Sequence, residues 1–273
     1  MVTVPDGGSR SVLPEGLAEA IRGTAADIAD VLREAADTGR PVPRSTWTVG
    51  EAAAHLAQAN ELMAAIAAGH TRAHGDGTPQ SLAAANEVAL AAFDERTAGP
   101  LAEMIAEQAD AFLTAIEERA PEEVLDTPLG PMGPAVLGSY LLTHMLGHGY
   151  DLALALGRPH MLDRARVELT LPFMITAMPR VVDPTAVDGL TARFAVRLWG
   201  GARFGVTVAD NAVRATAEPP ARPDCTILTE PVAFLLLGLG RTDPWGVIAT
   251  GRALSWGRKP WLGPRFPRLF TAP

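Results

Sequence analysis

The spacing of apolar residues changes once along this chain, near residue 160, and that change limits the folds available to it. Before this point apolar residues recur every three or four positions, as they do in amphipathic helices. After a short apolar segment they alternate with polar ones, so that Phe194, Val196 and Leu198 of "RFAVRLW" share one face. We therefore expect a helical domain over residues 1–160 and a small α+β domain over residues 161–273.

Boundary signals divide the first part into four long helices. The stretch "TVGE", which begins at Thr48, is a capping box that starts one of them. A helical run over 81–119 contains Gly99 and Pro100, which should kink or split it. The last helix should end at Gly157. Four long helices with short connections predict an up-and-down four-helix bundle.

The C-terminal part combines strands with short helices. The pairs Gly200-Gly201 and Asp210-Asn211 are turn signals between alternating runs. Two helical segments, around 231–239 and 258–270, flank a possible strand at 252–256. This order predicts a small α+β domain.

Composition narrows the partners and the compartment. A net charge of −8 argues against nucleic acid or an anionic membrane as the main partner. No run of 18 apolar residues occurs, and the first residues lack a signal-peptide pattern, so we expect neither a membrane span nor secretion. Cys225 is the single cysteine, which excludes an internal disulfide and fits the cytoplasm. The chain could be a monomer or a homodimer.

Two histidines stand four residues apart in an apolar helix. His144 and His148 project from one helix face, roughly one turn apart. Leu141 and Leu152 lie on the same stripe, so this face should point into the bundle. Asp151 follows on the same side, where a carboxylate can orient a metal-binding imidazole.

A third histidine, His55, lies on an apolar face of the helix that follows the capping box. Three inward histidines from two helices could bind one divalent metal ion and leave a coordination position open, as catalytic zinc sites do. The alternative is that they are hydrogen-bonded core residues. The spacing alone leaves both interpretations open.

Motifs on these helices resemble a known family. "STWTVGEAAAHLAQ" is similar to the second-helix motif of DinB-like four-helix bundles, in which a tryptophan precedes an inward metal-binding histidine. "LLTHMLGHGYDLALALGRP" resembles the fourth-helix motif of the mycothiol-dependent maleylpyruvate isomerase family. "PLGPMGP" and the "AAANE" around Asn86 also resemble that family. The segment "PDCTILTEPVAFLLLGLGRTDP" is similar to the sterol-carrier-like domain often fused to such bundles.

The resemblance implies a metal site and a thiol cofactor. It assigns His55, His144 and His148 as ligands of a divalent metal, with zinc first and iron or nickel as alternatives, and Asp151 as the accompanying acid. It implies that mycothiol binds its sulfur at the open position, where the metal lowers the pKa of the thiol. The thiolate would then attack a small electrophilic substrate that carries a carboxylate, in an isomerase or an S-transferase reaction.

The sequence departs from the family pattern at two positions. His144 stands where the isomerases commonly have glutamate, so three neutral imidazoles would leave the metal its full charge and make it a stronger Lewis acid. Arg252 follows Gly251 where the sterol-carrier-like end usually has an acid. The second departure concerns the identity of the substrate.

Asn86, Arg252 and Arg258 are the candidates for binding the cofactor or the substrate. The two arginines could clamp carboxylates, or they could belong to the exposed face of the last helical segment. Asn86 could point at the metal site, or it could stand near a helix start because asparagine is common there.

Two other functions stay open. The chain could be a non-enzymatic module that binds a small ligand or a protein, with a structural metal and with "FLLLGLG" and "PFMITAMP" lining a pocket. It could also be a metal-dependent hydrolase whose open position holds water. In that case Asp151 would have to be the base, since no glutamate stands beside a histidine as in His-Glu-x-x-His helices.

Overall fold

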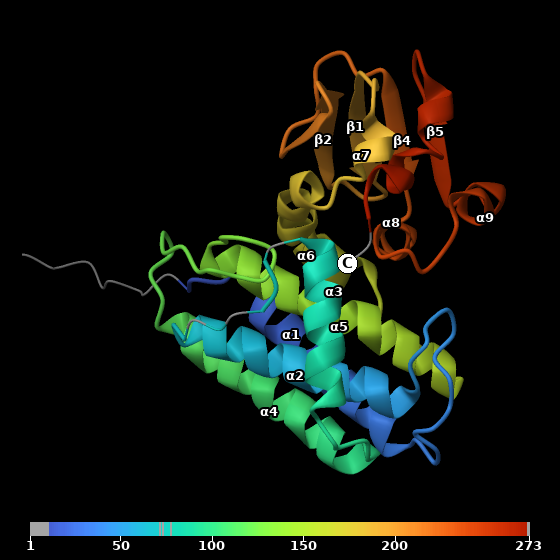
Figure 1. Cartoon of the computed structure of the whole chain (residues 1–273). Coiled ribbons are helices and arrows are strands. Elements are labelled where there is room, and N and C mark those ends of the chain that lie inside the picture. The colour runs from blue at the N-terminus through green and yellow to red at the C-terminus, as the bar shows by residue number, and fades with distance from the viewer. Residues whose placement is uncertain (1–10, 71, 73, 77, 272–273) are drawn as a thin grey trace, which may run out of the picture.

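The computed structural model describes residues 11–70, 72, 74–76 and 78–271. A layer of helices is built from the N-terminal part of the chain, and a five-stranded sheet with short helices lies beyond one end of it (Figure 1). This is the predicted combination of a helical region and a small mixed α and β region. Within the described residues, no helix is both long enough and apolar enough to cross a membrane.

Four long helices pack around one core. They are α1 (Leu17–Arg33), α2 (Val49–Ala67), α4 (Ala98–Glu117) and α5 (Pro134–Leu156). Helices α1 and α2 each pack against both α4 and α5. Fully buried side chains from each helix meet between them, including Ile28, Leu56, Ile105, Phe112 and Leu141. The removal of this apolar surface from water is the main force that holds the layer together.

The ends of α2 and α5 follow the sequence signals. Thr48 and Glu51 form the predicted capping box at the start of α2. Gly157 ends α5 in the left-handed conformation, with φ of 68°, which glycine adopts without a steric penalty. Helix α1 ends at Arg33, and residues 34–48 connect it to α2.

The split in the third helical run was predicted at the wrong place. The chain leaves the helical conformation after Ala91, at the end of α3 (Pro79–Ala91), and α4 starts at Ala98. Gly99 and Pro100 lie in the first turn of α4, where amides have no intrahelical partner and proline costs little. Arg96 stabilises the break by donating to the carbonyls of Leu90 (2.9 Å) and Phe93 (2.6 Å).

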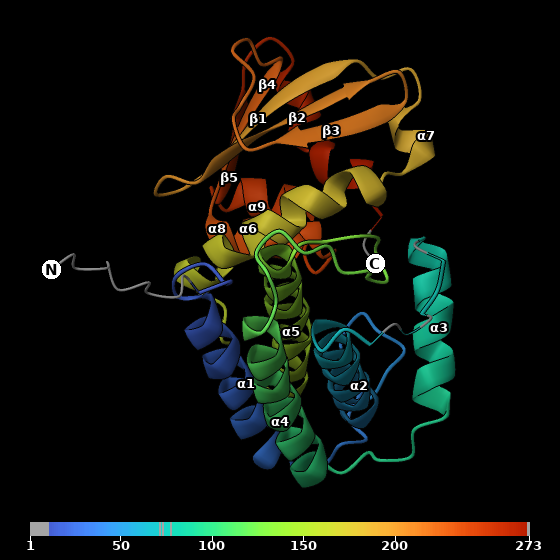
Figure 2. The same ribbon diagram turned by 90° about the vertical axis from the view of Figure 1, so that its left-hand side faces the viewer.

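Helix α3 is therefore a separate element. It packs against α2 and lies at the edge of the helical layer (Figure 2). Several of its residues are exposed, among them Val88 at 71%. Its inner side faces a cavity described below.

The sheet has the order β3-β2-β1-β4-β5, and only the central β1–β4 pair is parallel. Its strands are β1 (Ala192–Leu198), β2 (Arg203–Ala209), β3 (Ala212–Thr216), β4 (Cys225–Thr229) and β5 (Ala253–Trp256). Asp210 and Asn211 have positive φ angles and form the predicted turn between β2 and β3. The predicted inward residues Phe194, Val196 and Leu198 are buried.

Short helices accompany the sheet. Helix α8 (Pro231–Gly238) and strand β5 match two of the predicted segments, while α7 (Pro184–Val187) and α9 (Pro244–Ala249) were not predicted. The segment 258–270 is not one helix but two 3₁₀ turns, Pro260–Leu262 and Phe266–Leu269. Its prolines at 260, 264 and 267 remove amide donors that a continuous α-helix would need.

Helix α6 (Arg164–Ala177) joins the two parts of the structure. It packs against α5 on one side and α8 on the other. Pro172 interrupts its hydrogen-bond ladder, and a serine from α5 fills the gap: the Ser139 hydroxyl donates to the Leu169 carbonyl (2.8 Å) and accepts from the Phe173 amide (3.1 Å). One buried hydroxyl thus satisfies both backbone groups and fixes α6 on α5.

Replacing this serine should weaken the junction. In Ser139→Ala the Leu169 carbonyl and the Phe173 amide lose their partner in the interior, which should cost about 1–3 kcal/mol of unfolding free energy. Urea denaturation measures the loss. The control is Thr114→Ala, which removes an exposed hydroxyl that bonds to the Asp110 carbonyl on α4. Equal effects of the two substitutions would contradict the proposed role of Ser139.

Candidate metal centre

Three histidines from two helices meet between α2 and α5. His55 comes from α2, and His144 and His148 come from successive turns of α5. One ring nitrogen of each can be chosen so that all three lie within 4.8 Å of one another. The Nε2 atoms of His55 and His144 are 3.1 Å apart. The structure therefore brings together the three ligands predicted from the sequence.

The surroundings keep these imidazoles neutral. Burial, with a contribution from His74, lowers the pKa of His55 to about 4. Burial also holds the pKa values of His144 and His148 well below the usual range, and the neighbouring histidines and Arg241 add to the effect. Neutral imidazole is the form that binds a metal, so protons compete weakly for these side chains at neutral pH.

The donor set fits a divalent metal ion. Tetrahedral zinc, with Zn–N bonds of about 2.0–2.1 Å, places two nitrogen ligands roughly 3.3 Å apart, close to the His55–His144 separation. The Nδ1 atom of His144 is buried and has no hydrogen-bond partner among the described residues, and a metal bound at Nε2 would leave it so. The support for a metal therefore comes from the Nε2 separation. Imidazole donors suit zinc, iron, nickel and copper.

Trp47 forms one wall of the centre. It lies just before the capping box of α2, which fixes the start of that helix. Its ring centroid is 4.8 Å from that of His55 and 6.1 Å from that of His148. The indole therefore covers two of the three imidazoles with apolar surface.

Asp151 links the histidines to the C-terminal part of the chain. It lies one turn beyond His148 on α5, and its Oδ2 is 3.6 Å from Nδ1 of that residue. The same carboxylate accepts two hydrogen bonds from the guanidinium of Arg241, at 3.2 and 2.8 Å. Arg241 is further fixed because it donates to the carbonyl of Leu239 (2.6 Å). This pairing places a carboxylate beside His148, as the sequence predicted, and adds an arginine.

Arg241 was not among the residues selected from the sequence. It follows α8 in "FLLLGLGRTDP" and is 90 positions from Asp151, so no local pattern connects them. The one available signal is a charged residue three positions after the end of a strongly apolar helix.

A cavity of about 460 Å³ extends from the histidines towards α3. Its polar lining includes Gln58, Arg72, His74, Asn86 and Arg241. The Oδ1 atom of Asn86 is 2.8 Å from Nε2 of His74, so Asn86 does face the cavity. His74 is half-buried in the same wall.

Arg252 and Arg258 lie elsewhere. Arg252 pairs with Glu230 (2.7 Å), the residue that caps α8. Arg258 pairs with Asp224 (3.0 Å), and its side chain is 74% exposed. Among the described residues that line the cavity, the arginines are Arg72 and Arg241. These two are better placed than Arg252 and Arg258 to meet an anionic ligand near the histidines.

Comparison with known proteins identifies the family of the chain. The family model for the mycothiol maleylpyruvate isomerase N-terminal domain matches residues 17–153, half of the chain. The chain belongs to this family. The match spans all three histidines and Asp151, and it confirms the resemblance inferred from the helix motifs. No curated protein matches the sequence.

Solved structures show the same fold. The crystal structure of the mycothiol-dependent maleylpyruvate isomerase and that of a histidine-to-alanine mutant each superimpose with a TM-score of 0.53 at 12% identity. Each comparison covers 89% of this chain and 93% of the other. The likeness extends beyond the N-terminal domain and includes the C-terminal part.

Acid should destabilise the metal-free protein. An unfolded histidine has a pKa near 6.5, whereas His55 in the folded chain has one of about 4, so the unfolded state takes up more protons between these values. The stability that neutral His55 contributes is complete above the higher value and is lost as pH falls towards the lower one. The expected loss is about 1.4 kcal/mol per pH unit for this residue. Urea denaturation of chelator-treated protein across this window measures it.

Two variants isolate the effect of the buried histidine. His55→Leu should lose a large part of the pH dependence, because the titrating group is gone. His160→Leu, at an exposed position, should keep the wild-type dependence. If His55→Leu and the wild type lose stability equally on acidification, the account of His55 is wrong.

Proposed function

We propose that this chain is a metal-dependent enzyme with mycothiol as its thiol cofactor. It acts on a small electrophilic substrate that carries a carboxylate, either as an isomerase or as an S-transferase. One observation supports it most strongly: three neutral histidines, of which His55 is buried and His144 and His148 are half-buried, lie at the end of a large, partly polar cavity. Family membership supports the choice of mycothiol.

His55, His144 and His148 are the proposed ligands of the divalent metal, with zinc first and iron or nickel as alternatives. A metal held by them would act as a Lewis acid and lower the pKa of a cofactor thiol, so that thiolate is present at neutral pH. The three ligands carry no negative charge of their own. Asp151 is then the nearest carboxylate, 3.6 Å from the His148 ring.

Asp151 acts in this proposal as a positioning residue. It can accept the second ring N–H of His148 and so fix the orientation of that imidazole. Arg241 holds the carboxylate in place with two hydrogen bonds and partly offsets its charge. Because Asp151 is engaged in this way, it is poorly suited to be the base of a metal-dependent hydrolase.

The rest of the cavity would bind and orient the reactants. Arg72 and Arg241 supply positive charge for a substrate carboxylate. Asn86, His74 and Gln58 offer hydrogen-bonding groups for the polar parts of the cofactor. Apolar side chains such as Trp47 and Met63 line the remaining wall and keep water away from the reacting groups.

A nucleophile from the protein is not part of this proposal. Cys225 is fully buried in β4, and burial raises the pKa of its thiol to about 11.

We propose that the enzyme acts in the reducing cytoplasm, where a thiol cofactor persists. We also propose that residues 1–160 form the metal-binding domain and residues 161–273 the second domain, in a monomer or homodimer.

Metal content and thiol dependence test the proposal together. The untagged protein should bind about one zinc, iron or nickel ion per chain, measured by plasma mass spectrometry, and should convert a carboxylate-bearing electrophile only when thiol is added. His148→Ala should lose both properties while circular dichroism shows that the helices remain. His160→Ala, at an exposed position, should keep both. Full metal occupancy in His148→Ala would exclude this ligand set.

Asp151→Asn separates positioning from ligation in the same measurements. The amide keeps the shape of the side chain but loses the charge that Arg241 and His148 share. We expect metal binding to persist with an affinity about 10–100-fold lower. Wild-type affinity and activity in this variant would show that Asp151 has no part in the metal centre.

A further inference from the structure

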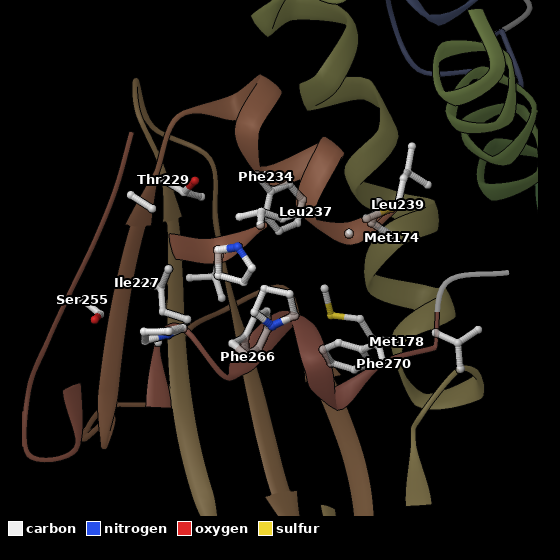
Figure 3. A pocket seen from close by; sticks show the side chains of 18 of the residues that line it. Met174, Met178, Ile227, Thr229, Phe234, Leu237, Leu239, Ser255, Phe266 and Phe270 are labelled. Carbon is white, nitrogen blue, oxygen red and sulfur yellow. The ribbon is translucent and has the colours of Figure 1, made fainter. Parts of the chain in front are cut away.

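A second cavity lies between α6, α8 and the sheet (Figure 3). Its volume is about 90 Å³. The side chains around it are almost entirely apolar and include Met174, Met178, Ile227, Phe234 and Phe266, with Thr229 and Ser255 at its edge. Figure 3 shows these side chains converging from the helices and from the sheet. The segments "PFMITAMP" and "FLLLGLG", which the sequence offered as the lining of a pocket, both contribute to it. The proposed enzyme function does not use this cavity.

The two cavities share a wall. Phe173 and Leu239 line both the histidine cavity and the apolar one. Phe173 is stacked on Tyr140, another lining residue of the histidine cavity, with ring centroids 4.2 Å apart. Leu239 lies just beyond the end of α8, two residues before Arg241. A residue that lines both cavities thus lies two positions from the residue that holds Asp151.

This wall and the cavity lining can adapt. Leu239 is only half-buried and lies outside a helix, so its rotamer is less restricted than that of a core residue. Met174 approaches Gly238 so closely that an added Cβ would come within 2.5 Å of its Cε. Methionine side chains fill irregular space and rearrange readily. Glycine at 238 leaves that methionine the room it occupies.

The size of the cavity limits its occupant. A water-sized group fills about 30 Å³, so this space holds about three or four carbon atoms. A fatty acyl chain or a sterol does not fit into this space as a whole. It suits a short apolar group that enters from the neighbouring cavity.

We propose that this pocket binds a short apolar arm, of about three or four carbons, of the molecule whose reactive end lies at the histidines. The arm passes between Phe173 and Leu239. The inference rests on the proposed function and specifies it further: the preferred substrates or thiol adducts carry a small alkyl or branched group in addition to the polar end. Their apolar end is recognised by the C-terminal domain and their reactive end by the helical one.

Binding of simple alkanethiols tests this without turnover. Protein loaded with cobalt(II) should develop a thiolate-to-metal absorption band on titration with a series of n-alkanethiols of increasing length. Each methylene that enters apolar surroundings should raise affinity about fourfold. The gain should stop once the pocket is full.

Variants of the pocket assign that gain to its site. Ala177→Phe fills the apolar pocket and should abolish the gain for longer thiols while leaving the affinity for the shortest thiol unchanged. Met174→Ala enlarges it and should extend the gain to longer chains. Ala212→Phe is the matched control, because it adds the same ring at an exposed position on β3. It should behave like the wild type.

The outcomes distinguish a failure of the proposed function from a failure of the inference about the apolar pocket. If no thiol of any length produces the band in the cobalt-loaded protein, both the proposed function and this inference are overturned. If thiols bind but Ala177→Phe and Met174→Ala keep the chain-length dependence of the wild type, the inference alone is wrong. A gain that disappears in Ala177→Phe and persists in Ala212→Phe supports it.

Discussion

The packing of α2 against α5 is the contact on which the rest of this structure depends. It places His55 opposite His144 and His148 in an interior where burial keeps all three neutral. Buried polar groups are costly unless they are satisfied, and the Nε2 atoms of His55 and His144 face each other at 3.1 Å. Apolar residues in place of these histidines would make the packing of the two helices more stable. Metal binding offers a physical reason for this arrangement.

The C-terminal part of the chain contributes to the surroundings of the histidines. Arg241 reaches back to Asp151 on α5, and Leu239 contributes to the cavity wall. Helix α6 fixes the relative position of the two parts, because Ser139 of α5 bonds to the backbone at the Pro172 break. The helical part alone would lack the arginine that bonds to the Asp151 carboxylate.

Local patterns predicted much of the fold and the three candidate ligands. His144 and His148 share a face because they are four residues apart in a helix whose C-terminal end is marked by Gly157. His55 was identified because it lies on an apolar stripe after a capping box. These are properties of short segments, and they do not depend on contacts between distant parts of the chain. The alternation of Phe194, Val196 and Leu198 predicted β1 for the same reason.

The features that sequence analysis missed depend on contacts between distant segments. Arg241 meets Asp151 only when the C-terminal part of the chain packs against α5. The break before α4 is stabilised by Arg96, which bonds to carbonyls at the end of α3 in a way that glycine and proline positions do not reveal. The shared wall of Phe173 and Leu239 likewise exists only in the assembled structure. Tertiary packing decided each of these outcomes.

X-ray absorption of the zinc-loaded protein at the zinc edge tests the central claim most directly. The account predicts three imidazole nitrogens at about 2.0–2.1 Å and one exchangeable oxygen ligand from water. Addition of a thiol should replace that ligand with sulfur at about 2.3 Å while the imidazole shell stays unchanged. A spectrum without imidazole scattering, or a four-coordinate shell of protein ligands that thiol does not alter, would contradict the account.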